Sequence, residues 1–326
     1  MLERSLDLIG LGECMVELWS DDALGQAQTL RKAFGGDVLN ALLTAARLGS
    51  KTGFVTRVGD DPFGSSLLQT WRAEGIDTTH APLVDGVNGI YFVSVQADGE
   101  REFSYRRAGS AASMLASSDL DPAYLTSARI LLLSGITQAL SASAQAATLA
   151  AAHIARATGT LIAYDPNYRP RLWADRAGSP EAGLASAQAA VRELLPLVDV
   201  VLPSVPGELP IFAESVSIES MARSLARLGP RIVAYKAGAE GAWIFENNHL
   251  VRVAADPVFK VVDTTGAGDA WNGAFLHVLA QGRSTLEAAE QANRIAALKL
   301  GYRGAIPPRD TLHSCEACPT AWATVE

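Results

Sequence analysis

The sequence is poor in the residue types that build disulfide frameworks and metal centres. Its 326 residues include only 3 cysteines, at positions 14, 315 and 318, and this odd number does not suit a disulfide framework. Cys315 and Cys318 form a lone CxxC close to His313, whereas a structural zinc site needs four ligands. A metal or redox role for the pair is therefore the less favoured interpretation. The 5 histidines form no HExxH, and no GxSxG occurs, which argues against the common metalloproteases and serine hydrolases.

Long hydrophobic runs and an excess of positive charge are also lacking. No window of 18 apolar residues occurs, so no transmembrane helix is expected, and the first ten residues do not resemble a signal peptide. The 35 acidic and 27 basic residues give a formal net charge of −8, a field that repels nucleic acid and anionic membrane surfaces. With 48% hydrophobic and 19% charged residues, the chain is predicted to be a soluble, cytoplasmic, globular protein.

Short β-branched segments alternate with amphipathic stretches along almost the whole sequence. Strands are expected at 6–12, 52–58, 129–134, 160–165, 198–202 and 231–236. Helices are expected at 37–48, 62–74, 141–157, 181–195, 218–228, 268–281 and 284–300. Continuously apolar strands such as 130–133 suit a parallel sheet covered on both faces. The pattern predicts a doubly wound α/β fold that forms a single domain over residues 1–326.

Two stretches, 13–33 and 89–107, break this rhythm. Both alternate apolar and polar residues, and neither has a helix between its parts. We expect them to pair in an antiparallel manner into a small separate sheet. Since the stretches lie apart in the sequence, this sheet would be a discontinuous β lid beside a ligand cleft.

The strongest chemical signal is the segment 263–275, which reads DTTGAGDAWNGAF. Gly266, Ala267 and Gly268 can direct backbone N–H groups at one point as a helix begins, where the helix dipole also favours negative charge. Asp269 would face the same point, and a carboxylate there is repulsive to phosphate unless it orients and deprotonates an attacking hydroxyl. A plain turn with an acidic residue at the helix start is the alternative. No Walker A sequence is present.

This segment resembles the second signature of the ribokinase-like (PfkB-type) carbohydrate kinases. Residues 35–40 (GGDVLN), followed by 45–49 (AARLG) and 58–64 (VGDDPFG), resemble the first signature. The resemblance runs from about residue 8 to 308 in the correct order. It implies a large α/β domain with a small β lid, and an enzyme that uses ATP and Mg²⁺ to phosphorylate a sugar or sugar acid.

The resemblance also implies roles for individual residues. Asp269 matches the catalytic base, and Gly266, Ala267 and Gly268 match the hole for the transferring phosphoryl group. The turn that binds sugar hydroxyls is matched by Gly35, Gly36 and Asn40. The nucleotide-binding positions are matched by Lys236, Gly238, Gly241 and, near the adenine, Asn293. Without the resemblance, Lys236 would be interpreted as a solvated lysine at a strand end.

The segment 203–208 departs from the family pattern. The family usually carries Asn-x-x-Glu, tied to Mg²⁺ and phosphate, whereas Ser204 stands here in place of the Asn and Glu208 lies one position late. Glu208 is the candidate for contact with Mg²⁺ through water. The resemblance also allows a monovalent cation near Asp263, Thr265 and Ala305.

Within the family, the 2-keto-3-deoxygluconate kinases are the most similar. Segment 165–173 (DPNYRPRLW) resembles theirs and places Arg169 near substrate and phosphate, and segment 105–112 resembles their substrate clamp. Tyr105 and Arg107 would face the sugar acid, with Tyr91 as a further lid candidate. A guanidinium matches a carboxylate in bidentate geometry. A solvated strand edge is the alternative for Arg106 and Arg107.

Other functions remain open. Fructokinases share the DPNxRxxLW segment, so it does not separate the two groups. Segment 303–307 (RGAIP) resembles the ending found in sugar kinases in general. In 2-keto-3-deoxygluconate kinases an acidic residue that binds the substrate can stand near Ala305. Glu17 could supply the acid that holds a sugar hydroxyl, with a plain strand residue as the alternative. A non-catalytic sugar-acid sensor is disfavoured by the intact GAGD turn, and a Rossmann dehydrogenase by the short Gly10-Leu-Gly12. Lid sheets in this family often pair between subunits, which allows a homo-oligomer.

Overall fold

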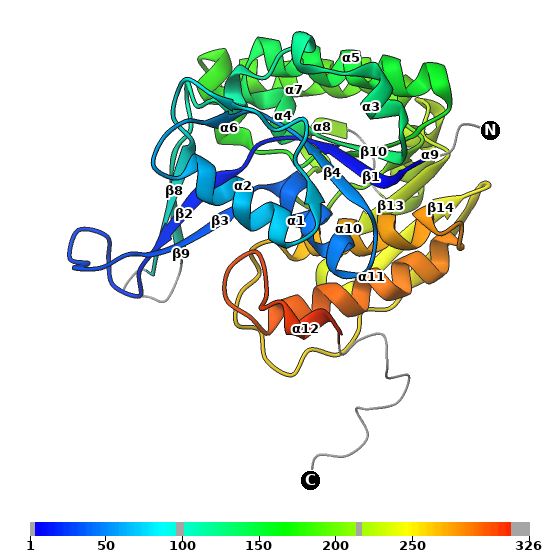
Figure 1. The fold of residues 1–326 in the computed structure, drawn as a ribbon. Helices are drawn as coiled ribbons and strands as arrows, with labels where there is room; N and C mark the ends of the chain where they lie inside the picture. The colour runs from blue at the N-terminus through cyan, green and yellow to red at the C-terminus, as the bar shows by residue number, and fades with distance from the viewer. Residues whose placement is uncertain (1–3, 96–100, 213–216, 314–326) are drawn as a thin grey trace.

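The structure, a computed structural model, describes residues 4–95, 101–212 and 217–313; Cys315 and Cys318 lie outside them (Figure 1). Within these residues, nine strands form the main sheet in the order β15-β14-β13-β12-β11-β10-β1-β4-β6. The neighbours from β13 to β6 pair in parallel, and β13, β14 and β15 are antiparallel. The bounds are β1 Leu6–Leu11, β4 Thr52–Val55, β6 Ile76–Asp77, β10 Ala128–Ser134, β11 Leu161–Asp165, β12 Val200–Val201, β13 Ile232–Lys236, β14 Ala242–Glu246 and β15 His249–Val253.

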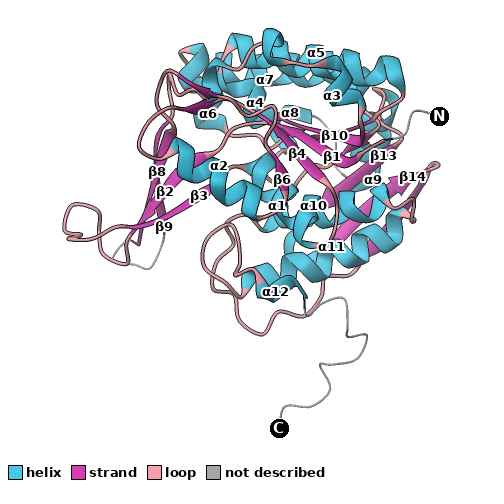
Figure 2. Ribbon diagram, in the orientation of Figure 1, coloured by secondary structure: helices cyan, strands magenta, loops and turns pink. Residues whose placement is uncertain are grey.

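Helices cover both faces of this sheet (Figure 2). One face carries α1 (Asp37–Arg47), α10 (Ala267–Ala280) and α11 (Thr285–Leu300), and the other carries α5 (Ala142–Thr158), α7 (Pro180–Leu194) and α9 (Ile218–Arg227). Successive residues of β10 enter opposite cores: Ile130 and Leu132 pack on the α1 side, Leu131 and Leu133 on the α5 side. This confirms the doubly wound fold with continuously apolar strands.

The remaining elements are short or connect the layers. The helices are α2 (Gly64–Ala73), α3 (Pro122–Thr126), α4 (Gly135–Leu140), α6 (Pro170–Ala177), α8 (Leu209–Phe212) and α12 (Asp310–His313). A two-stranded sheet pairs β5 (Val58–Gly59) with β7 (Leu83–Val84). In the described part of the chain, no helix combines the length and the apolar character needed to cross a bilayer. The sequence analysis missed the short helices α3, α4, α6, α8 and α12, the short strands β6 and β7, and the strands β14 and β15 at one end of the main sheet.

A second sheet projects from one end of the main sheet (Figure 1). Its order is β3-β2-β8-β9, from β2 (Met15–Trp19), β3 (Arg31–Gly35), β8 (Gly89–Val95) and β9 (Arg101–Arg106). The pairs β2–β3 and β8–β9 are antiparallel hairpins, as expected. The expectation of antiparallel pairing throughout is wrong for β2 and β8, which pair in parallel because both strands leave the main body in the same direction. We call these four strands the lid sheet.

Two glycines join the lid sheet to α1. A Cβ on Gly35 would lie 2.6 Å from the Tyr91 hydroxyl, and a Cβ on Gly36 would lie 2.1 Å from the Glu13 carbonyl oxygen. Gly36 has an extended backbone (φ −173°), so close packing and not conformation requires a glycine there. The strand–helix corner is therefore built with no room for a side chain.

Gly36→Ala should lower the free energy of unfolding by about 1–3 kcal/mol, because the methyl group forces the backbone at Glu13 to move. Urea denaturation of both proteins measures the difference. Gly25→Ala is the control, since a Cβ on Gly25 meets no atom within 4 Å. Equal stability of the two variants would contradict the close approach.

Candidate active site

The carboxyl ends of the parallel strands bring distant polar residues together, as expected at this edge of an α/β sheet. Asn40 in α1 donates from Nδ2 to Asp269 Oδ2 in α10 at 2.8 Å, across 229 positions of the sequence. Both residues were predicted to belong to the site, and the structure places them in direct contact. The two helices pack side by side, so their first turns open toward the same place.

A buried ion pair lies beside this contact. Lys236, the last residue of β13, donates from Nζ to Asp165 Oδ2 at 2.8 Å and to Asn272 Oδ1 at 3.1 Å. Asn272 in α10 also donates to Asp165. The side chains of Lys236 and Asp165 are 9% and 6% exposed. The interpretation of Lys236 as a solvated strand-end lysine is therefore wrong.

The predicted anion-binding turn leads into α10 beside this lysine. Gly266 caps the helix with φ +74°, a conformation that favours glycine, and a Cβ there would lie 2.7 Å from the Ala305 carbonyl oxygen. A Cβ on Gly268 would meet only the Lys236 side chain, at 3.9 Å. The Ala267 amide donates to the Thr264 carbonyl oxygen and closes the turn, while no backbone partner is found in the described chain for the amides of Gly266 and Gly268. Open space, a helix N-terminus and an ammonium group together suit a phosphate.

Several buried carboxyl groups surround the ion pair and raise one another's pKa. Burial, with a contribution from Asp37, raises the pKa of Asp269 to about 7, although the Asn40 hydrogen bond acts in the opposite direction. Burial also raises the pKa of Glu208 to about 8, with help from Asp165. Asp37 accepts from Ser134 and Asn167 through Oδ2, while its Oδ1 is buried without a hydrogen-bond partner.

The buried carboxyl groups are better suited to bind hydroxyl donors, or a cation that phosphate also binds, than to form a metal site made of protein ligands alone. The described residues contain no cluster of three or more His, Cys, Asp or Glu able to hold a metal ion. Mg²⁺ is commonly bound through one or two carboxylates together with substrate phosphates and water. Glu208, whose Oε2 accepts from the Ser204 amide at 2.6 Å, is 4% exposed and belongs to this acidic group.

The lid sheet contributes aromatic and charged side chains. The Tyr91 hydroxyl donates to Glu17, and the Tyr91 and Tyr105 rings stack with centroids 5.8 Å apart. Arg107 pairs with the buried Glu13, and its guanidinium lies 4.5 Å from the Tyr105 ring centroid. The sequence predicted Tyr91, Tyr105 and Arg107, and the structure brings them together.

Arg169 approaches the same aromatic cluster from the main domain. It is the N-cap residue of α6, and its exposed side chain has no hydrogen-bond partner in the described part of the chain. Burial raises the pKa of Tyr105, whereas the positive charges of Arg107 and Arg169 act to lower it. Two guanidinium groups from different segments are therefore close enough to act on one phenol.

The predicted nucleotide residues divide into two groups. Gly238 (φ +56°) and Gly241 (φ +93°) form the turn after β13, and a Cβ on Gly241 would lie 2.1 Å from the Val253 carbonyl oxygen. Asn293 is buried, donates to the carbonyl oxygens of Val253 and Ala254, and accepts from Trp271. Its side chain thus fixes the chain after β15, and a direct contact with adenine stays a prediction.

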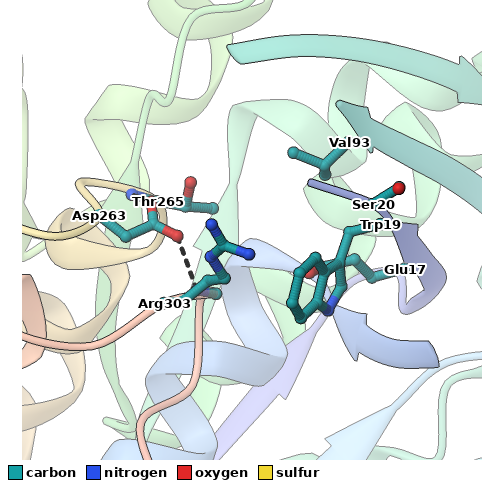
Figure 3. A pocket seen from close by; sticks show the side chains of 8 residues that line it. Glu17, Trp19, Ser20, Val93, Asp263, Thr265 and Arg303 are labelled. Atoms are coloured by element: carbon teal, nitrogen blue, oxygen red, sulfur yellow. Dashed lines mark hydrogen bonds between the residues drawn. The ribbon is translucent and has the colours of Figure 1, made fainter. Parts of the chain in front are cut away.

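A pocket lies between the lid sheet and the loop before α10 (Figure 3). Its lining consists of Glu17, Trp19, Ser20, Val93, Asp263, Thr265, Arg303 and Gly304. The Arg303 guanidinium lies 4.5 Å from the Trp19 ring centroid. None of the residues around the Lys236–Asp165 pair lines this pocket, so it lies beside the acidic cluster and does not form it.

The sequence analysis missed four polar residues that the structure adds to the site. They are Glu13, Asp37, Asp165 and Asn272. Asp37, Asp165 and Asn272 stand inside motifs already quoted, GGDVLN, DPNYRPRLW and DTTGAGDAWNGAF, so polar residues within those motifs were the available signal. Glu13 follows the first strand and had no such signal beyond its position at a strand end.

The sheet, the anion-binding turn and the acid beside it define a phosphotransferase of the ribokinase-like fold. The chain belongs to the pfkB family of carbohydrate kinases, whose family model matches residues 6–312. Relatives include a 2-dehydro-3-deoxygluconokinase of Escherichia coli K12, 31% identical over 314 residues, which cover 93% of this chain and 97% of that protein. Fructokinase-1 of rice (Oryza sativa subsp. japonica) is 31% identical over 325 residues, covering 95% and 97%.

Solved structures share the fold. A PfkB protein from Polaromonas sp. JS666 superposes with a TM-score of 0.83 at 33% identity, covering 95% of this chain and 100% of that chain. An E. coli protein described as a ribokinase II, in complex with ATP and Mg²⁺, superposes with a TM-score of 0.84 at 24% identity, covering 95% and 98%. The protein is thus a carbohydrate kinase with a ribokinase-like fold.

Lys236→Met should lower the free energy of unfolding by about 3–5 kcal/mol, because it leaves the buried Asp165 carboxylate without its counter-charge. Chemical denaturation at neutral pH measures the loss. Arg129→Met is the control, since Arg129 pairs with Asp7 at the surface and should contribute less than about 1 kcal/mol. A similar small loss for both variants would show that the Lys236–Asp165 pair does not balance the buried charge.

Proposed function

We propose that this kinase phosphorylates 2-keto-3-deoxygluconate (2-dehydro-3-deoxygluconate) on its 6-hydroxyl. The observation that carries the proposal is the position of Arg107 over the Tyr105 ring, with the positive charge of Arg169 also acting on that phenol. A pair of guanidinium groups beside a half-exposed phenol recognises a carboxylate and its neighbouring carbonyl, which a neutral sugar lacks. The relatives named 2-dehydro-3-deoxygluconokinase, including one from Thermoproteus tenax at 33% identity, support this substrate.

The proposed chemistry uses Asp269 as the base. Its carboxylate, oriented by Asn40, accepts the proton of the attacking hydroxyl, and a pKa near 7 matches that task at neutral pH. Gly35, Gly36 and Asn40, together with the unpartnered Asp37 Oδ1, hold the sugar hydroxyls. Burial by the lid sheet, with Tyr91 on its inner strand, excludes water from the reacting groups.

The nucleotide would lie on the opposite side of Asp269. ATP with Mg²⁺ supplies the γ-phosphoryl group and neutralises part of its charge. The backbone of 266–268 and the Lys236 ammonium would hold the phosphates, since Gly268 leaves that space open. Gly238 and Gly241 would shape the loop beside the nucleotide, Asn293 would position its adenine side, and Glu208 would contact Mg²⁺ through water. The E. coli protein of the same fold solved with ATP and Mg²⁺ supports the use of these two ligands.

The remaining features of the proposal concern the whole molecule. We propose one ribokinase-like domain with the lid sheet as its discontinuous insertion, a cytoplasmic location, and a homo-oligomer that forms through the lid. The family resemblance allows a monovalent cation near Asp263, Thr265 and Ala305, where the last turn of α11 already brings the positive charge of Lys299 to the Asp263 carbonyl oxygen.

Fructose is the second candidate substrate. Ala305 packs against Gly266 and offers no acid there, and rice fructokinase-1 is as similar overall as the E. coli 2-dehydro-3-deoxygluconokinase. In addition, the charge of Arg107 is already paired with Glu13, so a neutral sugar needs no further ion pair there.

Asp269→Asn should bind ATP and fold normally but lose about 10²–10⁴-fold in kcat, because an amide cannot accept the proton. In the unchanged protein, the raised pKa of Asp269 keeps this carboxyl protonated at low pH, so kcat/KM should rise with pH and level off above about pH 7. Steady-state assays across the pH range measure both effects. Asp175→Asn, at an exposed position, is the control. A flat pH profile together with near-normal kcat in Asp269→Asn would exclude Asp269 as the base.

Arg107→Leu should raise KM for 2-keto-3-deoxygluconate by about 30-fold or more, the effect of one lost charge-assisted contact, and should change KM for fructose much less. Assays of both substrates with the unchanged protein and the variant measure this, and the unchanged protein should prefer the acid. Arg107→Leu also leaves the buried Glu13 carboxylate without its ion-pair partner. The double variant Glu13→Gln/Arg107→Leu removes that charge as well, so it tests the loss of the substrate contact alone. Arg106→Leu, an exposed neighbour, is the control. Equal losses for both substrates would favour a fructokinase.

A further inference from the structure

A fully buried lysine lies next to the anion-binding turn, outside the substrate site. Lys299, in the last turn of α11, is 0% exposed. Its Nζ donates to the carbonyl oxygen of Asp263 at 2.6 Å and to that of Tyr302 at 3.2 Å. Burying an ammonium group is unfavourable unless polar groups replace its water. Main-chain carbonyl oxygens are also the ligands that replace the water around K⁺ in proteins.

The two hydrogen bonds of Lys299 are more than the usual contact between a lysine and the carbonyl oxygens at the end of its own helix. A cation in the last turn of a helix can bind carbonyl oxygens at the helix end, and Tyr302 lies just past the end of α11. Asp263 lies 36 positions earlier, outside α11, in the loop that leads to α10. The shorter of the two bonds therefore ties the end of one helix to the loop that begins another.

The side chain of Asp263 connects the Lys299 contact to the turn at 266–268. Its Oδ1 accepts from the Thr265 amide at 2.8 Å and its Oδ2 from the Gly304 amide at 2.6 Å (Figure 3). Burial acts to raise the pKa of Asp263, but these hydrogen bonds and the Lys299 charge hold it below its ordinary value. Gly266 in turn packs on the Ala305 backbone. The position of the helix start thus depends on a charged, buried junction between segments 263–266 and 299–305.

We infer that the Lys299 ammonium acts as the built-in monovalent cation of this kinase, so that phosphoryl transfer needs neither K⁺ nor Na⁺. The Asp263 carbonyl oxygen is bound to Nζ, so a free ion near Asp263, Thr265 and Ala305 does not fit the residues present. Lys299 is a positioning residue: it touches neither substrate nor nucleotide and fixes the turn 266–268. The inference deepens the proposed function, and rests on it only for the role of that turn.

Two variants separate the charge of Lys299 from its bulk. Lys299→Ala removes the charge and opens space for an ion, whereas Lys299→Met removes the charge and keeps the space filled. With tetramethylammonium as the only cation besides Mg²⁺, kcat of both variants should fall by about tenfold, with a smaller change in KM for the sugar substrate. At constant ionic strength, K⁺ or NH₄⁺ should restore Lys299→Ala and not Lys299→Met. The unchanged protein and Lys51→Ala, at an exposed lysine, should be insensitive to the ion.

Thermal unfolding gives a readout that needs no substrate. K⁺ should raise the Tm of Lys299→Ala above its value in tetramethylammonium, and should leave the Tm of Lys299→Met and of the unchanged protein in place. The inference is overturned if K⁺ activates the unchanged protein several-fold, if Lys299→Ala is fully active in tetramethylammonium, or if folded Lys299→Ala does not respond to K⁺. If Lys299→Ala does not fold in the presence of any of these cations, the inference is tested by the activity of the unchanged protein across the same series of cations. The assay uses whichever substrate, sugar acid or fructose, is phosphorylated, so a wrong substrate assignment leaves this test intact.

Discussion

The site depends on one buried ammonium group in an acidic interior. Lys236 bonds Asp165 directly, and its charge also lowers the pKa of Glu208 and Asp269, which burial raises. Without this charge, the carboxyl groups would repel one another in a region where water cannot screen them. Their remaining excess of negative charge is the physical reason why the site suits hydroxyl donors and a divalent cation.

The main sheet and the lid sheet hold different groups of the proposed site. The main sheet and its helices hold the groups expected to carry out phosphoryl transfer, with Asp269 and the turn of 266–268 at the start of α10. The lid sheet holds Tyr91 and Tyr105, and Arg107 follows its last strand; these are the groups proposed to contact the sugar. The lid joins the main body through the tightly packed corner at Gly36, where the chain enters α1. Substrate preference can then change in the lid while the phosphoryl-transfer groups stay the same.

Much of the fold and part of the site follow from the sequence. The periodicity of hydrophobic residues predicts six of the seven strands that pair in parallel in the described main sheet and the seven long helices, because burial on both faces of a sheet leaves a local pattern. The GAGD turn is also local, since a glycine at φ +74° and a helix start need only neighbouring residues. The parallel pairing of β2 with β8 was missed because strand direction depends on how the chain leaves the main body, which no local pattern records.

By itself, the sequence determined the layers, the segments of the second sheet, the glycine turn at the start of α10 and the acid that follows it. Only the tertiary structure decided which charges meet. Asn40 and Asp269 are 229 positions apart, and Lys236 reaches Asp165 across 71. It also decided that Lys236 and Lys299, which look alike in sequence, are both buried, one among carboxylates and one among carbonyl oxygens. The reason is physical: the partners of a buried charge are set by packing between distant segments, and composition and period describe only the segments themselves.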